Sequence, residues 1–258
     1  MSLILKRAFD FVAATCGLIV FSPLLLAVML AIWLQDRQSP FYIARRAARG
    51  GGTFRMVKFR SMVVNADRIG GASTASTDRR ITPVGRFVRA YKLDELIQLW
   101  NVVTGDMSLV GPRPQVMSDA ALYTDLEQRM LTVRPGITDP ASIVFSDEGE
   151  VLKGASNPDR EYNRLIRPWK SRLALAYIDN RSFAVDLGLI ILTIVAIVSR
   201  PTALAGLGRL LSGWRLHPLV IRMAARQEPL LAYPPPGAEA APQHSLTVVA
   251  KGHVAGPN

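Results

Sequence analysis

The sequence contains very few of the side chains that most often build disulfides and metal centres. Its 258 residues include one cysteine, Cys16, and three histidines, His217, His244 and His253. A single cysteine excludes an internal disulfide and a thiolate zinc site. Because all three histidines fall in the last fifth of the chain, an imidazole base in the central region is not expected. Chemistry there would rest on carboxylates, cations and a hard metal held by oxygen.

Acidic residues are also in the minority. Asp and Glu total 20 against 31 Lys and Arg, which gives a net charge of +11. Such a balance indicates an anionic partner: nucleic acid, anionic lipid or a phosphorylated substrate. The basic residues are spread along the chain without a recognition motif, so we expect no nucleic-acid partner. The mean hydropathy of +0.20 is high for a soluble protein of this size and indicates membrane association.

An uncharged run near the N-terminus is the main membrane signal. Residues 11–34 carry no charge, and as a helix they would extend roughly 36 Å, enough for a bilayer core of about 30 Å. Ser22 and Pro23 interrupt the run, which predicts a kink or break. Lys6 and Arg7 precede it and arginines follow it, so both ends are predicted to be cytoplasmic. A re-entrant helix and a kinked single-pass anchor both stay open, while a cleaved signal peptide is disfavoured.

The following region predicts a small hairpin and several helices, within a mainly helical α+β fold. Residues 40–62 contain two strand-like stretches separated by Gly50–Gly52, which predicts a turn rather than a phosphate loop, because no Walker or dinucleotide pattern is present. A helix is expected to begin at Thr82-Pro83. Another amphipathic helix is expected over residues 117–133.

The centre of the chain, residues 89–114, combines acids, a helix start and a fixed arginine. Asp94 and Glu95 open an apolar-periodic run that predicts a short helix ending at residues 104–105. A carboxylate in the first turn is favoured by the helix dipole, which predicts an ionised Asp94. The rigid turn at residues 111–114 then presents one guanidinium. Together these features suggest a site for phosphate and metal.

The C-terminal half is less distinctive. Residues 136–150 predict a solvated acidic loop, since the EF-hand spacing is absent. Residues 183–198 are apolar but short for a spanning helix, which predicts a core or interfacial helix. We expect four regions: a membrane helix (1–36), a catalytic domain (37–200), an amphipathic segment (201–225) and a disordered tail (226–258). The acids of the loop are Asp139, Asp147, Glu148 and Glu150.

Taken in order, these motifs resemble the bacterial sugar-transferase family, the monotopic polyprenyl-phosphate phosphoglycosyl transferases. The resemblance covers roughly residues 5–200, and the chain lacks the multi-span N-terminal region of longer members, so a minimal catalytic form is expected. The motifs that carry it are Lys6-Arg7-x-x-Asp10, Ser22-Pro23, KFRSM at 58–62, Arg89, Asp94-Glu95, GDMSLVGPRP at 105–114 and RPGIT at 134–138.

The resemblance implies a fold, a location and a reaction. Its N-terminal helix would be re-entrant, broken at Ser22-Pro23, on the cytoplasmic face of the bacterial inner membrane, with interfacial amphipathic helices in the catalytic domain. Asp94 would attack the β-phosphorus of a UDP-sugar, release UMP and hold a phosphosugar that passes to polyprenyl (undecaprenyl) phosphate. Glu95 would complete the catalytic pair, and both acids are associated with Mg²⁺. The product would initiate exopolysaccharide, O-antigen or glycoprotein glycan assembly.

Physical arguments assign further roles and alternatives. Phosphate-binding cations are expected at Lys58, Arg60, Arg89 and Arg113, because an anionic nucleophile attacking a diphosphate needs charge neutralisation. Adjacent acids diverge by about 100° on an ideal helix, so they cannot both aim at one atom unless the first turn deforms. The family's usual Gly-Trp-Ala-Gln is replaced by residues 139–142, and an acid found in some members is missing near Ala174, which leaves the sugar open. The alternative is a silent membrane adaptor that binds anionic lipid. Homodimerisation stays open.

Overall fold

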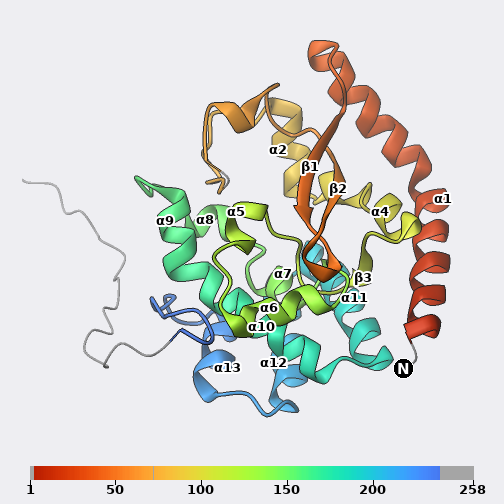
Figure 1. The fold of residues 1–258 in the computed structure, drawn as a ribbon. Helices are drawn as coiled ribbons and strands as arrows, with labels where there is room; N and C mark the ends of the chain where they lie inside the picture. Colours follow the sequence, from red (N-terminus) through yellow and green to blue (C-terminus); the bar gives the residue numbers. More distant parts are fainter. Residues whose placement is uncertain (1–2, 72, 239–258) are drawn as a thin grey trace, which may run out of the picture.

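A single long helix, α1 (Leu3–Asp36), runs along one side of the molecule and bends near its middle (Figure 1). The structure, a computed structural model, describes residues 3–71 and 73–238. Pro23 lies inside α1, where it has no N–H to donate and its ring crowds the preceding turn. The Ser22 hydroxyl donates to the Ile19 carbonyl at 2.7 Å. The predicted break is therefore a bend within one continuous helix.

Both halves of α1 pack against the rest of the chain. In the first half, Ala14 is fully buried beside Val102 of α4 (Leu99–Thr104). In the second half, Ile32 is buried in a cluster that contains Phe59. Within the described residues, α1 alone is long and apolar enough to cross a membrane. Its outward side exposes large apolar side chains, among them Phe11, Ile19, Val20, Leu26, Leu30 and Leu34.

Two antiparallel strands, β1 (Phe41–Ala47) and β2 (Thr53–Phe59), form the predicted hairpin. The turn between them contains Gly50 and Gly51, whose φ angles of 83° and 82° lie in the left-handed region that favours glycine. The glycine run is therefore a turn, as expected from the sequence.

The side chain of Asn101 takes the place of a neighbouring strand beside β2. Its carbonyl oxygen accepts the Val57 N–H at 2.9 Å, and its amide nitrogen donates to the Arg55 carbonyl at 2.8 Å. Asn101 is buried, and these bonds satisfy two backbone groups of β2 that its partner strand does not pair. They fix the hairpin to α4.

A second sheet brings two distant motifs together. Its strands, β3 (Ser108–Val110) and β4 (Gly136–Thr138), run parallel. The two segments of the chain cross just beyond β3, where the Gly136 N–H donates to the Pro112 carbonyl at 2.9 Å. A Cβ on Gly136 would lie 2.1 Å from the backbone nitrogen of Gly111, so only glycine fits this crossing. The GDMSLVGPRP and RPGIT motifs are therefore neighbours in space.

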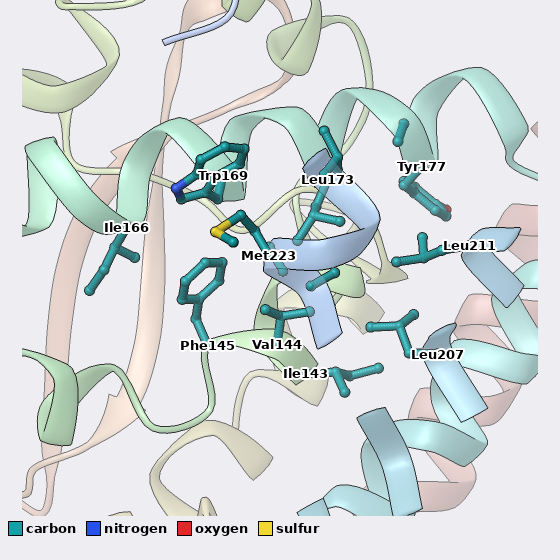
Figure 2. Close-up of a cluster of buried hydrophobic side chains, with 14 of the residues drawn as sticks. Ile143, Val144, Phe145, Ile166, Trp169, Leu173, Tyr177, Leu207, Leu211 and Met223 are labelled. Atoms are coloured by element: carbon teal, nitrogen blue, oxygen red, sulfur yellow. The ribbon is translucent and has the colours of Figure 1, made fainter. Parts of the chain in front are cut away.

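The largest apolar core lies among the helices of the C-terminal half. α10 (Arg167–Asn180) packs against α7 (Pro140–Val144), α12 (Arg200–Ser212) and α13 (Pro218–Ala225). Full burial of one large apolar side chain contributes about 1.5–3 kcal/mol, so this cluster dominates the stability of the domain. Figure 2 shows Trp169, Leu173 and Tyr177 of α10 among Ile143, Val144, Phe145, Leu207, Leu211 and Met223.

The apolar helix α11 (Phe183–Val198) is only partly covered. Leu189 is fully buried in the core, which agrees with the expected core contact. The opposite side exposes Leu187, Ile191, Ile194, Ile197 and Val198.

Short helices connect these layers. The predicted helix over residues 117–133 is three short pieces, because Thr124 begins a new helix in which its hydroxyl and the Glu127 carboxylate form a capping box. Helix α2 begins at Thr82-Pro83, as expected. The short elements are η1 (Arg49–Gly51), η2 (Ala66–Arg68), α2 (Pro83–Ala90), α3 (Leu93–Leu96), α5 (Met117–Ala120), α6 (Asp125–Gln128), η3 (Arg129–Thr132), α8 (Glu148–Val151), α9 (Pro158–Glu161) and η4 (Tyr162–Ile166).

Residues 226–238 do not form the disordered tail that the sequence predicts. Residues 226–238 pack on the domain, because this segment carries apolar side chains within its Pro-rich sequence. The Trp169 indole donates to the Leu231 carbonyl at 2.8 Å, and its ring lies 5.1 Å from that of Tyr233. The expected disorder of residues 239–258 falls outside the described residues. The expected amphipathic segment, 201–225, is α12 with α13.

Candidate active site

The hairpin carries two cations on its inner face. Arg46 lies opposite Phe54, and Lys58 follows Phe54 by four residues on β2. Because residues two apart on a strand share a face, Arg46, Phe54, Met56 and Lys58 all point to one side. Met56 is 3% exposed, so this face is turned toward the interior.

The two adjacent acids lie in α3, a single helical turn. Lys92 precedes it with a left-handed φ of 56°, and the Gln98 N–H donates to the Glu95 carbonyl at 2.9 Å, three residues back. The expected helix from Leu93 to residue 104 is therefore two short pieces, α3 and α4, with tighter turns between them. Asp94 and Glu95 consequently face different surroundings.

Glu95 is held between two cations. The Arg113 Nη1 donates to Glu95 Oε2 at 2.9 Å, its Nη2 donates to Oε1, and Lys58 Nζ lies 3.3 Å from Oε1. This is the bidentate geometry that makes arginine–carboxylate pairs strong. Burial acts to raise the pKa of Glu95, but the charges of Arg113 and Lys58 outweigh it and hold that pKa well below its ordinary value. Glu95 is therefore an ionised, fully paired carboxylate.

Asp94 has the opposite environment. It is 7% exposed, and none of the described residues donates a hydrogen bond to its carboxylate. Burial, followed by the negative charge of Glu95, raises the pKa of Asp94, while Lys58, Arg89 and Lys92 oppose the shift. The expected stabilisation by a helix dipole is outweighed, because a single turn accumulates little dipole and the group is buried. Two neighbouring acids with pKa values pushed apart are typical of divided catalytic roles.

Arg113 comes from the turn after β3, between two buried prolines. The crossing at Gly111 and Gly136 fixes this turn, and Arg113 also donates to the Ile137 carbonyl at 3.3 Å. Burial opposes its charge, but the carboxylate of Glu95 raises the pKa of Arg113 further. The arginine predicted from the motif therefore reaches the acid pair.

Arg60 does not belong to this site. Its Nη1 and Nη2 donate to Asp36 at 2.6 and 2.7 Å, and its Nε donates to the Ser39 carbonyl at 2.7 Å. Strand alternation places residues 58 and 60 on one face, but β2 ends at Phe59 and the chain turns away. The phosphate-binding role expected for Arg60 is corrected: the side chain binds the end of α1.

Two cations near the acids were missed by sequence reasoning, and one was expected. Arg89 lies in α2 with no ion pair inside the described part of the chain, and its charge acts on Asp94, so its phosphate-binding role stays a prediction. Lys92 acts on the same carboxyl from the position just before the acids. Arg46 acts on Lys58, and the two-residue alternation of β1 was the signal for it.

The acidic loop is only partly solvated: Glu150 is exposed, as expected, whereas Asp139 is buried and Asp147 and Glu148 are half-buried. Asp139 is 1% exposed, and its Oδ1 accepts the N–H and the hydroxyl of Ser142, both at 2.7 Å, at the start of α7. Glu148 pairs with Lys170, and Asp147 pairs with Arg200 and Arg226. The basic side chains of the C-terminal helices neutralise the loop, which the local sequence could not reveal.

The residues at the start of α1 fix it to the domain. Lys6 Nζ lies 2.5 Å from Asp186 Oδ2 of α11. Arg7 donates to the Val102 and Val103 carbonyls at 2.5 and 2.8 Å, at the C-terminal end of α4, where a cation complements the helix dipole.

Asp10 completes this attachment. Its carboxylate accepts the Ser108 hydroxyl at 2.8 Å and the Leu109 N–H at 3.3 Å, both from β3. The predicted membrane motif of Lys6, Arg7 and Asp10 therefore joins α1 to α4, α11 and β3.

The acids can be tested as a metal site. Glu95 has both oxygens occupied by cations, whereas Asp94 has neither. Residues 3–71 and 73–238 contain no cluster of three or more Asp, Glu, His or Cys side chains that could hold a metal ion. Mg²⁺ commonly binds through one or two carboxylates together with substrate phosphates and water. Asp94 fits that arrangement, whereas Glu95 would first have to release its cations.

The sequence of this chain matches a known protein family. A family model described as bacterial sugar transferase matches residues 1–200, and the chain belongs to this family. It is 40% identical over 148 residues to the exopolysaccharide production protein ExoY of Sinorhizobium fredii, a match covering 52% of this chain and 66% of that protein.

Two longer relatives carry the names of phosphotransferases. The chain is 37% identical over 196 residues to undecaprenyl-phosphate glucose phosphotransferase of Komagataeibacter xylinus, covering 73% of this chain and 35% of that protein. It is 40% identical over 152 residues to undecaprenyl-phosphate galactose phosphotransferase of Salmonella typhimurium, covering 52% of this chain and 31% of that protein. The matched segments thus span about a third of these two proteins.

Asp94→Asn should stabilise the folded protein at pH 7 in metal-free buffer. An acid whose pKa is raised by folding lowers stability above that pKa, because the folded chain holds a desolvated charge that the unfolded chain exposes to water. Below the unfolded pKa of about 3.9 both states are neutral and this effect vanishes. We therefore expect a higher Tm for the variant at pH 7, with a gain that shrinks toward pH 4.

Thermal unfolding in EDTA-containing detergent buffer from pH 7 to pH 4 measures this gain. The exposed Asp67→Asn is the matched control and should leave Tm unchanged. A gain that is absent, or that is independent of pH, would contradict the described environment of Asp94.

Proposed function

We propose that the protein transfers a sugar 1-phosphate from a UDP-sugar to polyprenyl phosphate and so initiates exopolysaccharide or related glycan assembly. Membership of the bacterial sugar transferase family and the names of its relatives support this proposal. The observation that carries it is a buried carboxylate, Asp94, that has no hydrogen-bond partner among the described residues yet lies among cations that suit a diphosphate.

In the first step, an Asp94 oxygen forms a bond to the β-phosphorus of the donor. The bond between that phosphorus and the bridging oxygen breaks, and the electron pair leaves with UMP. In the second step, a phosphate oxygen of polyprenyl phosphate attacks the phosphorus and the Asp94 carboxylate departs. Dividing the reaction in this way lets one pocket accept two phosphates in turn. Burial leaves the Asp94 anion poorly stabilised. Once the donor diphosphate has neutralised the cations around it, the anion is a reactive nucleophile.

The remaining charges have separate tasks. Lys58 and Arg113 hold Glu95, so their positive charge stays fixed beside the reacting phosphorus. Arg89 and Lys92, which act on Asp94 through their charge, suit the phosphates of the donor. Glu95 is then a positioning residue for two cations, and Asp94 is the group that reacts.

Mg²⁺ fits this scheme, and Asp94 is the residue that would hold it. Bound there, it would supply neutralisation of the diphosphate charge. The ion pairs of Glu95 favour an outer role for that residue, in place of the direct ligand role expected from the family resemblance.

The placement of α1 supports a re-entrant, monotopic location on the cytoplasmic face of the inner membrane. At one end Lys6 pairs with Asp186 at 2.5 Å, and at the other Asp36 pairs with Arg60 at 2.6 Å. Both partners belong to the same folded domain. A spanning helix would separate its ends by a bilayer core of about 30 Å. The exposed apolar sides of α1 and α11 would then contact lipid.

Asp94→Asn should abolish UMP release from the UDP-sugar in the presence of polyprenyl phosphate, because an amide cannot act as the nucleophile. Glu95→Gln should reduce UMP release without abolishing it, since the cations lose only their organising partner. UMP release by purified protein over a panel of UDP-sugars measures both. Near-normal turnover of Asp94→Asn would contradict the mechanism, and a wild-type protein that binds anionic vesicles but releases no UMP would favour the adaptor alternative.

UMP release should stop in EDTA and return when Mg²⁺ is added in excess. The reason is the charge of the donor diphosphate, which approaches a carboxylate pair. The assay compares the same preparation before and after metal replacement. Turnover that continues at full rate in EDTA would rule out the proposed metal.

Both ends of α1 should be accessible only from the cytoplasm. Single cysteines at the exposed positions Leu3 and Gln38, in a Cys16→Ala background, would report this with a membrane-impermeant maleimide. We expect labelling of both in inside-out vesicles and of neither in intact spheroplasts. Labelling of Leu3→Cys in spheroplasts would instead indicate a spanning helix.

A further inference from the structure

A small polar pocket adjoins the acid pair through Arg113. Arg113, whose guanidinium binds Glu95, also lines this pocket, which lies between the turn at residues 112–115, α5, α7 and α10. Its volume is about 20 Å³, the space that roughly one water-sized group occupies. The groups that line it include Asp119, Tyr123, Asp139, Ser142, Tyr162 and Lys170.

Asp139 presents a free acceptor to this pocket. Its Oδ1 is used by the N–H and hydroxyl of Ser142, whereas its Oδ2 receives no hydrogen bond from the described residues. The residue is 1% exposed and lines this pocket. A buried acceptor without a partner is unfavourable, which favours a donor group in the pocket.

Asp119 faces the same pocket and is also unpaired. The residue is half-buried, and within the part of the chain that the structure describes its carboxylate forms neither a hydrogen bond nor an ion pair. Its nearest opposite charges, Arg167 and Arg46, act on it only through space. Two acceptors with unused capacity thus border a space of hydroxyl size.

We propose that this pocket takes one hydroxyl group of the donor sugar, which donates a hydrogen bond to Asp139 with Asp119 as a second acceptor. The inference rests on the proposed function. In a UDP-sugar the group attached to the β-phosphate is the sugar, and Arg113 places the pocket beside the residues assigned to that phosphate. A planar uracil ring is too large for it. Asp139 is therefore a specificity-determining residue for the sugar.

Asp139→Asn exchanges the free acceptor for an amide donor. The amide oxygen can still accept from Ser142 at the start of α7, so the fold is retained, which thermal unfolding checks. The substrates are the UDP-hexose that the wild type uses and analogues in which each hydroxyl in turn is replaced by hydrogen. A hydrogen bond to a charged group contributes about 1.5–3 kcal/mol, or roughly 10–150-fold in kcat/KM.

We expect the kcat/KM of the wild type to be lower by that factor for one of the analogues than for the full UDP-hexose. In Asp139→Asn this difference should shrink at least ten-fold for that analogue and stay unchanged for the others. Asp119→Asn, which disturbs no hydrogen bond of the fold, is the second variant and should weaken the same discrimination. Asp147→Asn, in the same loop but paired with Arg200 and Arg226, is the matched control and should leave it unchanged.

The outcomes separate the two proposals. Absence of UMP release from every UDP-sugar by the wild type would contradict the proposed function itself. An active wild type whose pattern over the analogues is unchanged in both pocket variants would overturn only the pocket assignment. Inhibition by UMP provides a further readout. If Asp139→Asn raised the inhibition constant of UMP as much as the KM for the donor, the nucleotide would lie in this pocket and the inference would be overturned.

Discussion

The pairing of Glu95 with Lys58 and Arg113 is the interaction on which the site depends. It joins three separate parts of the chain: the hairpin, α3 and the turn after β3. Two charges removed from water usually lose about as much hydration as they gain in attraction, so such a pair is retained only where its geometry is good or its function requires it. Here the bidentate contact meets the first condition. It also leaves Asp94 as the neighbouring carboxylate without a partner.

Two further constraints place this site beside the apolar helix α1. The glycine crossing at Gly111 and Gly136 fixes the turn that carries Arg113, and the contacts of Lys6, Arg7 and Asp10 attach α1 to the same region. Consequently the apolar helix and the charged site belong to one folded unit. A lipid phosphate held at the membrane surface would approach Asp94 without a large movement of the domain.

Much of this arrangement could be predicted from local sequence. The hairpin, the start of α2 and the meeting of Arg113 with the acids follow from turn residues, strand alternation and ordered motifs. The environments of the acids did not follow. A first-turn position predicts a stabilised Asp94 anion, but the burial that reverses the shift comes from elements distant in the chain.

Other errors have the same origin. Arg60 was assigned to phosphate because the reaction needs charge neutralisation, and the local pattern contains no sign that Asp36 binds it. Asp147 and Glu148 resembled a solvated loop because their partners, Lys170, Arg200 and Arg226, lie later in the chain. Tertiary ion pairs decide these cases, and they are absent from local composition.

Intact-protein mass spectrometry tests the central claim most directly. The protein would be incubated with its UDP-sugar in the absence of polyprenyl phosphate, and then digested to locate any added mass. The account predicts an increase equal to one sugar phosphate, on the peptide that contains Asp94, which disappears when polyprenyl phosphate is added. An active protein that shows no such adduct, and that releases UMP only when the lipid is present, would contradict it.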